Sequence, residues 1–196
     1  LSFTDGYICL GNDMTQRQFR FGVEDKLYKG NEGIQLFHAQ NRVPTSSVLV
    51  KRKVLQETGG FPEDPDIQNC EDYFLWTSLL EQGCSLLGIQ KPLLLYRVYP
   101  ESSTGKEIKL LFPLLNCLIR IPGKHDRAVQ VHLHTTVKKL LELIETNEAY
   151  EGAKPLLKKV ISNLYIRFQK KIILLALYTN RKLLLSLLWR IKPNKK

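Results

Sequence analysis

Glycine and proline cut residues 41–105 into short segments whose patterns alternate between strand and helix. Residues 71–82 have apolar side chains at helical spacing, and Gly83 follows them as a stop signal. Residues 61–69 hold two prolines and three acids, which indicates a loop. Such alternation is typical of an α/β fold. The predicted elements are a buried strand at 48–50, a helix at 51–58 closed by Gly59-Gly60, a helix at 71–82, and strands at 85–89 and 93–98.

The segments on either side have different patterns. Residues 1–40 predict a strand at 3–10, a polar turn at 11–13 and then a helical stretch. The part from residue 106 onward predicts helices only. These helices are at 108–121, where Pro113 starts or kinks the helix and Pro122-Gly123 ends it, at 126–146, and after Pro155, where apolar residues follow a three-four spacing.

Charge divides the chain at about the same place. The 196 residues carry a net charge of +10, but residues 1–105 sum to −3 and residues 106–196 to +13. We therefore predict a first domain at 1–105 and a basic helical extension at 106–196, enough chain for one core and an appendage. A positive excess of this kind points to an acidic partner, either anionic lipid or nucleic acid.

The first ten residues lack the basic start, apolar middle and cleavage site of a signal peptide, and the first residue is Leu. We expect the chain to be the tail of a longer protein; an alternative start codon is the other explanation. Isolated cysteines without a signal peptide indicate a reducing cytoplasm. They form no Cys-x-x-Cys pair, and His132 and His134 would point apart on a helix, so no zinc site is predicted. The cysteines are Cys9, Cys70, Cys84 and Cys117.

Two adjacent acids, Glu71 and Asp72, stand where the loop at 61–69 enters the helix at 71–82. Acids at a helix N-terminus meet unpaired N–H groups and the positive end of the helix dipole, so helix capping is one interpretation. A catalytic role is the other, because a positioned carboxylate can act as a general base. The surrounding sequence bears on the choice.

Upstream of the pair, the segment Val43-Pro44-Thr45-Ser46-Ser47-Val48-Leu49-Val50-Lys51-Arg52 leads into Thr58-Gly59-Gly60-Phe61. Downstream, Lys91 to Pro100 (KPLLLYRVYP) is followed by Glu101-Ser102-Ser103. This ordered set, with Glu71-Asp72-Tyr73-Phe74-Leu75-Trp76 between, resembles the second half of family 2 glycosyltransferases of the GT-A fold. The resemblance covers residues 41–104, about a third of the chain, and implies a partial GT-A mixed sheet with helices followed by an all-α extension.

The resemblance implies roles for single residues. Asp72 takes the position of the general base of an inverting transfer, and Glu71 supports it. Trp76 would be an apolar wall under a sugar ring or a core residue, and Arg97 would face the leaving diphosphate or pair with a loop acid. Further substrate contacts are implied for Thr45, Ser46, Tyr99 and Ser102.

Two departures from the family pattern stand out. Many members have His where this chain has Tyr99, and a phenol cannot replace imidazole as a ligand without losing its proton. In the family, an Asp-x-Asp motif upstream of this segment holds magnesium or manganese against the nucleotide-sugar diphosphate, and residues 1–40 of this chain contain no Asp-x-Asp. Asp5 and Asp13 are poor substitutes. We therefore expect the donor and its divalent metal to bind a missing N-terminal half of the full-length enzyme.

The segment at 170–190 is rich in Leu and Ile but carries Asn180, Arg181 and Lys182 near its centre. Each central charge costs about 2.5–3.5 kcal/mol on insertion scales, so a spanning helix is disfavoured. A basic amphipathic helix on the membrane surface, with Tyr178 and Trp189 at the interface, is one interpretation, and a helix packed on the catalytic domain is the other. Nucleic-acid binding is disfavoured because exposed stacking aromatics are lacking.

The sequence thus predicts a glycosyltransferase that moves a sugar with inversion from a nucleotide-sugar donor to a glycan or lipid-linked acceptor. We expect it to act in cell-surface polysaccharide synthesis, in the cytoplasm at the inner face of the membrane. A non-catalytic acceptor-binding or membrane-docking fragment is the alternative.

Overall fold

The computed structural model describes residues 1–11, 13–15, 17–99 and 107–143. The chain divides into two compact units, Leu1–Leu140 and Leu141–Lys196, and almost all of the described residues belong to the first unit. The predicted boundary near residue 105 lies inside this first unit. The predictions for Ser102 and for residues 155–196 lie outside the described residues.

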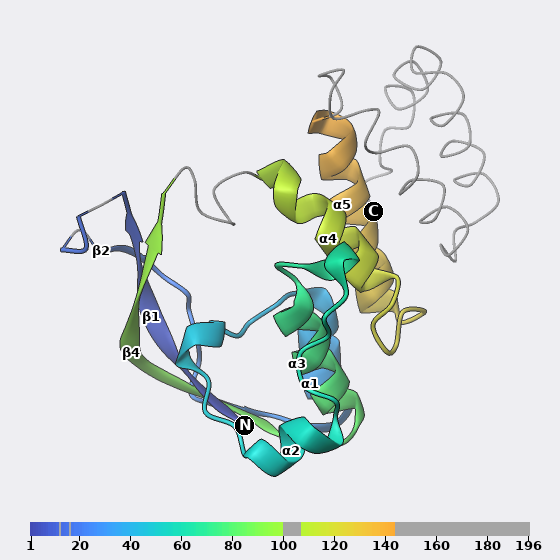
Figure 1. Ribbon diagram of the computed structural model, residues 1–196, viewed down its shortest axis with the longest axis horizontal. Coiled ribbons are helices and arrows are strands. Elements are labelled where there is room, and N and C mark those ends of the chain that lie inside the picture. The colour runs from blue at the N-terminus through green and yellow to red at the C-terminus, as the bar shows by residue number, and fades with distance from the viewer. Residues whose placement is uncertain (12, 16, 100–106, 144–196) are drawn as a thin grey trace, which may run out of the picture. The chain divides into compact units, whose positions relative to one another are not determined.

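A four-stranded mixed sheet forms one layer (Figure 1). Its order is β2-β1-β4-β3; β1 pairs with β4 in parallel, and the other two pairings are antiparallel. With the helices this makes the unit mixed α/β, so the predicted fold class is confirmed at that level. The strands are β1 (Ser2–Leu10), β2 (Arg17–Arg20), β3 (Lys26–Tyr28) and β4 (Leu86–Val98).

The two strands predicted at 85–89 and 93–98 form the single strand β4, so that prediction is wrong. The register against β1 shifts between Thr4 and Asp5 and again between Asp5 and Gly6, and Asp5 lies opposite Pro92. These irregularities let the strand accommodate a proline without ending. A side chain at Gly6 would meet Leu94 at 2.7 Å, so the closest approach of the two strands requires glycine there.

The helices predicted around the acidic pair are confirmed. α2 (Arg52–Glu57) is followed by Gly59, and α3 (Glu71–Glu81) is followed by Gly83. Both glycines have positive φ, +82° and +84°, which is the left-handed conformation that ends helices. Two short 3₁₀ turns, η1 (Thr45–Ser47) and η2 (Pro65–Ile67), lie in the connecting segments.

Residues 14–40 hold less helix than expected. Among the described residues of this segment, only Gly30–Ala39 is helical (α1), and β2 and β3 precede it. These strands exist because β1 and β4 offer edges for antiparallel pairing, which a local pattern does not reveal.

The prediction of a buried strand at 48–50 is wrong. Leu49 makes one antiparallel bridge with Ser2, through two hydrogen bonds of 2.8 and 2.9 Å. Its side chain is nevertheless 76% exposed. The bridge stops there because η1 ends immediately before this segment and α2 begins at Arg52.

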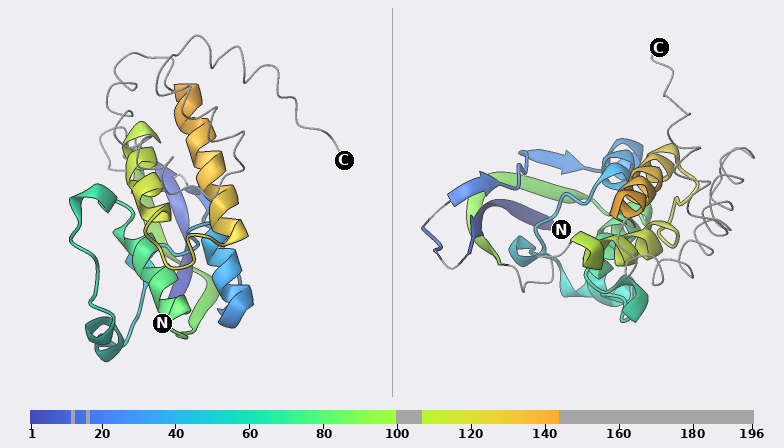
Figure 2. Two further views of the ribbon diagram at one scale, coloured as in Figure 1. Left: turned by 90° about the vertical axis from the view of Figure 1, so that its right-hand side faces the viewer. Right: turned by 90° about the horizontal axis from the view of Figure 1, so that it is seen from above.

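The core lies between the sheet and the pair α1 and α3, which pack side by side (Figures 1 and 2). Burying such side chains contributes roughly 1.5–3 kcal/mol each. The largest members of this core are Phe3, Tyr28, Phe37, Leu75, Trp76, Leu79, Leu80 and Leu86.

Two further helices, α4 (Glu107–Leu118) and α5 (Arg127–Leu143), follow the sheet along the chain. Both were predicted, and Pro113 lies inside α4. α4 packs against η2 and α3. The inward residues include Leu111, Leu115 and Leu118 of α4 and Val129, Leu133, Val137 and Leu140 of α5.

Candidate functional site

The acidic pair begins α3. Asn69 precedes it with φ +74°, a left-handed conformation that Asn tolerates better than most residues. The Cys70 N–H donates to the Ile67 carbonyl at 2.8 Å, which closes a tight turn. This turn places Glu71 and Asp72 in the first turn of the helix.

The Asp72 carboxylate is held by uncharged donors from three segments. Its Oδ1 accepts the Tyr73 N–H at 2.6 Å, and its Oδ2 accepts the Thr45 hydroxyl. The Asn41 side chain lies within hydrogen-bonding reach as well. Because the Asn41 Oδ1 accepts the Val43 N–H at 3.2 Å, the NH₂ of that amide is left to donate to the carboxylate.

Burial is the largest influence on Asp72 and raises the pKa of its carboxyl above the ordinary value. The neighbouring charge of Glu71 raises the pKa further. The hydrogen bonds from Thr45, the Tyr73 N–H and Asn41 act in the opposite direction. The net result is a carboxylate that takes up a proton more readily than an exposed Asp does.

Helix capping and a free carboxylate turn out to be compatible. Asp72 accepts one N–H in the first turn of α3, and the three donors from Tyr73, Thr45 and Asn41 occupy three of its four lone pairs, so one remains for a further donor. The neighbouring Glu71 Oε2 is buried and has no hydrogen-bond partner within the described part of the chain. A buried acceptor of this kind is normally matched by a donor, so a ligand hydroxyl or a water would suit it.

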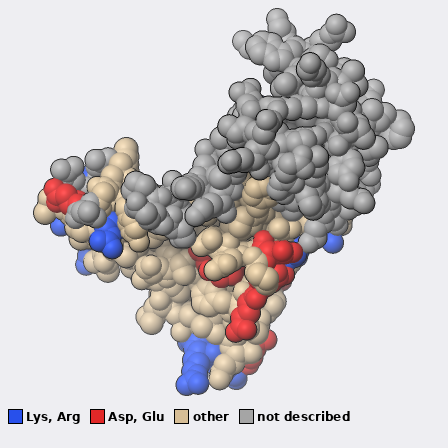
Figure 3. Space-filling model, turned by 45° about the horizontal axis from the view of Figure 1, so that its top comes forward, with Lys and Arg blue, Asp and Glu red and all other residues tan. Residues whose placement is uncertain are grey.

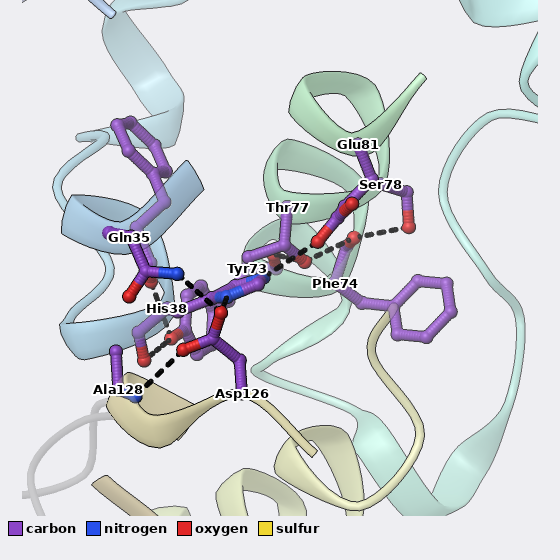
Figure 4. Close-up of polar contacts among 10 residues, drawn as sticks. Gln35, His38, Tyr73, Phe74, Thr77, Ser78, Glu81, Asp126 and Ala128 are labelled. Atoms are coloured by element: carbon purple, nitrogen blue, oxygen red, sulfur yellow. Dashed lines mark hydrogen bonds and ion pairs between the residues drawn. The ribbon is translucent and has the colours of Figure 1, made fainter. Parts of the chain in front are cut away.

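The helix that carries Asp72 is fixed to its neighbour. The Tyr73 hydroxyl donates to the Phe37 carbonyl at 2.7 Å, near the end of α1. Burial raises the pKa of this phenol well above its usual range, so it stays a donor. Further along α3, the hydroxyls of Thr77 and Ser78 donate hydrogen bonds to carbonyls one turn earlier in the same helix (Figure 4).

A buried histidine ties the far end of α3 to two other elements. His38 of α1 is 1% exposed, with its Nε2 3.1 Å from Glu81 Oε1 and its Nδ1 3.8 Å from Asp126 Oδ2. Figure 4 shows the ring between these two carboxylates. A side chain at Gly123 would meet the ring at 2.4 Å, so glycine lets the loop close over it. Asp126 also caps α5 through the Ala128 N–H at 2.9 Å.

A second buried carboxylate belongs to the sheet. Asp5 on β1 is fully buried, and its Oδ2 lies 2.5 Å from Arg20 Nη2. Its Oδ1 accepts the N–H groups of Gly6 at 2.8 Å and Gly22 at 3.2 Å. Arg20 continues to the Gln90 carbonyl at 2.6 Å, so this carboxylate joins β1 to β2, β4 and the turn after β2.

Of the other predicted substrate residues, the structure places Thr45 beside Asp72 and leaves Ser46 exposed in η1. Trp76 is 1% exposed, with the Phe61 ring edge-on at 5.7 Å. Its ring is therefore a core residue in this structure, which was one of its two interpretations.

Arg97 and Tyr99 are not brought to Asp72. Arg97 pairs with Cys9 on β1, whereas the segment of Thr45 meets β1 at Thr4, where Ser47 Oγ accepts the N–H at 3.0 Å. Cys9 and Thr4 are five residues apart on β1, which corresponds to about 16 Å along the strand. Figure 1 shows this end of β4 lying away from α3. The Arg97 guanidinium lies 5.1 Å from the centre of the Tyr99 ring.

Acidic side chains dominate the approach to α3. Residues 61–72 hold five acids and no Lys or Arg. Figure 3 shows a group of Asp and Glu near the middle of one face and further acidic atoms at its left edge, with Lys and Arg toward its margins. Arg120, which follows α4, supplies a counter-charge through ion pairs with Asp64 and, at 2.5 Å, with Asp66. Within the described part of the chain, no three His, Cys, Asp or Glu side chains cluster as metal ligands would. The implied magnesium or manganese therefore has no fitting ligand set among these residues.

Sequence reasoning missed three residues that the structure makes prominent. Asn41 and His38 stand in a segment predicted only in outline, and Asp5 was considered only as a metal ligand. A signal existed for Asn41, because it precedes Thr45 by four residues across a Pro-containing turn. None existed for His38, whose partners come from distant segments.

Comparison with protein-family models, with curated proteins and with solved structures found no match to this chain. No helix in the described part of the chain has both the length and the apolar character needed to cross a membrane.

Proposed function

We propose that this chain carries the catalytic-base half of an inverting glycosyltransferase of the GT-A type, similar to family 2 enzymes. One observation carries the proposal. Asp72 stands half-buried at the start of α3, held by uncharged donors, with a raised pKa. A general base works best when its pKa approaches the operating pH, and burial without a paired cation moves a carboxyl in that direction.

In the proposed reaction, an acceptor hydroxyl donates its proton to a remaining lone pair of Asp72. The hydroxyl oxygen forms a bond to the anomeric carbon as the bond from that carbon to the nucleoside diphosphate breaks with its electron pair. Attack opposite the leaving group inverts the configuration. The unmatched Glu71 Oε2 accepts another hydroxyl of the same acceptor and so orients it.

The proposal assigns the nucleotide-sugar donor to residues other than those described. A magnesium or manganese ion there would offset the charge of the leaving diphosphate. A glycan or lipid-linked acceptor, and a location at the inner face of the cytoplasmic membrane, belong to the same proposal. The basic segment at 170–190 motivates that location.

The direct test is Asp72→Asn in the full-length polypeptide, assayed for transfer from a panel of nucleotide sugars. Removing a general base lowers the rate by about 10²–10⁴-fold. Glu63→Gln is the matched control, since Glu63 is an exposed acid in the preceding loop. Transfer by Asp72→Asn at the rate of the control would sink the base assignment.

A non-catalytic acceptor-binding module is the second candidate. It is favoured by Tyr99, which replaces the family's His and contacts Arg97. If the wild-type polypeptide binds glycans but releases no nucleoside diphosphate with any donor and metal tested, this second candidate replaces the first.

A further inference from the structure

A small polar pocket lies beside the segment that holds Asp72. Its volume is about 200 Å³. One wall is the turn after β2, with Phe21 and Gly22, and the other is the segment that follows α1. Gln40, Asn41, Arg42 and Tyr28 contribute the polar lining.

The size of this pocket selects among ligands. Pockets for drug-sized molecules are about 300–1,000 Å³, so this one suits a single ring rather than a nucleotide sugar. Phe21 lines the pocket and is 37% exposed, and its ring lies edge-on to that of Tyr96 at 5.5 Å. A partly exposed aromatic beside amide and guanidinium donors can hold a pyranose ring by one face and by its hydroxyls.

Arg42 adds a charge requirement. Its Nε donates to the Leu36 carbonyl at 3.3 Å, and its guanidinium also contacts the Tyr28 hydroxyl. Arg42 has no ion-pair partner among the residues that the structure describes. The guanidinium is thus anchored in place with N–H groups left for a planar anion, and a carboxylate is the usual match.

Asn41 connects the pocket to the base. It lines the pocket and also lies within hydrogen-bonding reach of Asp72. We infer that this pocket is a subsite for one carboxylate-bearing sugar ring of the acceptor, with the carboxylate on Arg42 and the ring against Phe21. Its assignment to the acceptor rests on the proposed function, whereas binding by the pocket does not.

Binding is measured on the full chain without any donor, by amide chemical shifts in a titration. D-Glucuronate, D-glucose and acetate are the probes, at millimolar concentrations. We expect glucuronate to shift the amides of Phe21, Gly22 and Asn41, and glucose and acetate to bind at least about tenfold more weakly. Arg42→Gln should weaken glucuronate by about tenfold or more.

Arg127→Gln is the matched control, because Arg127 lines a separate groove of about 380 Å³ between α1 and α5. This variant should bind glucuronate like the wild type. Equal shifts with acetate, shifts that survive Arg42→Gln, or shifts confined to the groove of Arg127 would each overturn the inference. Since no transfer is measured, a failed Asp72→Asn test and a failed binding test remain distinguishable.

Discussion

Two carboxylates inside this molecule have opposite surroundings. Asp5 in the sheet meets a full cation, with Arg20 Nη2 at 2.5 Å, and two backbone N–H groups. Asp72 at the start of α3 meets a hydroxyl, a backbone N–H and an amide, and no ion pair with it occurs among the described residues.

The difference distinguishes an acid that links strands from the acid proposed above as a general base. Asp5 is bound to a cation and to two backbone N–H groups, so its carboxylate serves as a structural link among three strands. Neutral donors position Asp72 but offset only part of the cost of burial, so its proton affinity stays raised. Substitutions that move one carboxylate toward the state of the other therefore test the distinction.

Breaking the sheet pair should have the largest effect on stability. Asp5→Ala leaves the Gly6 and Gly22 N–H groups without their acceptor and leaves Arg20 uncompensated. Arg20 is 40% exposed and recovers part of its hydration, so we expect a loss of about 2–4 kcal/mol. Urea unfolding measures it. Asp72→Asn should cost less, and the reverse order would contradict the comparison.

If Asp72 is the proposed base, removing the hydroxyl beside it should move the pH profile of transfer. Thr45→Val deletes a donor that favours the charged carboxylate, so the pKa of Asp72 rises further. A bond to a charged group is worth about 1.5–3 kcal/mol, so activity on the acidic limb should fall about tenfold or more. Thr45→Ser, which keeps the hydroxyl, should retain the wild-type limb. The measurement is kcat/KM for the acceptor against pH.

The pKa of Asp72 also predicts how stability changes with pH. It is raised in the folded protein, so folding retains a proton there that the unfolded chain releases. Stability contributed by this group is therefore lost as pH rises from about 4, the ordinary Asp value, through the raised value. Asp72→Asn removes this dependence, so its melting temperature should gain on that of the wild type as pH rises across this window. A constant difference between the two proteins would count against a raised pKa.

Substitution of a third acid, Glu81, tests the same comparison and has the smallest expected effect on stability. Glu81, at the opposite end of α3 from Asp72, lies 3.1 Å from buried His38 and is 28% exposed. It belongs with Asp5, because its partner is a group that can carry positive charge. Glu81→Gln should cost about 1 kcal/mol in unfolding free energy and leave transfer unchanged. A loss of transfer without a loss of stability would group Glu81 with Asp72 instead of Asp5.

Local chemistry explains which elements were predictable. α2 and α3 were predicted because apolar spacing and the following glycines act within a few residues. β2, β3 and the unbroken β4 depend on which edges pair, and Leu49 depends on what covers it, so the local pattern misjudged all of them.

The residues of the candidate site likewise include some that the sequence predicted and some that it did not. The resemblance over residues 41–104 predicted that Thr45 and Asp72 belong to one site, and the structure joins them by a hydrogen bond. Asn41 escaped notice because its amide orientation is set by the Val43 N–H, a detail of one turn. Arg97 matched the motif as well as Thr45 did. It nevertheless lies opposite Cys9 on β1, five residues from Thr4, where the segment of Thr45 meets that strand.

Tyr73 has a consequence for motion. Its hydroxyl holds the first turn of α3 to Phe37, and four residues later Asn41 returns to Asp72. Covalent chain and hydrogen bonds thus close a ring through Asp72, Tyr73, Phe37 and Asn41. In such a ring, no single link lengthens without straining the others. Asp72 is therefore held in place from both of its neighbours in the ring, and if it is the proposed base, the acceptor has to approach a carboxylate whose position is already fixed.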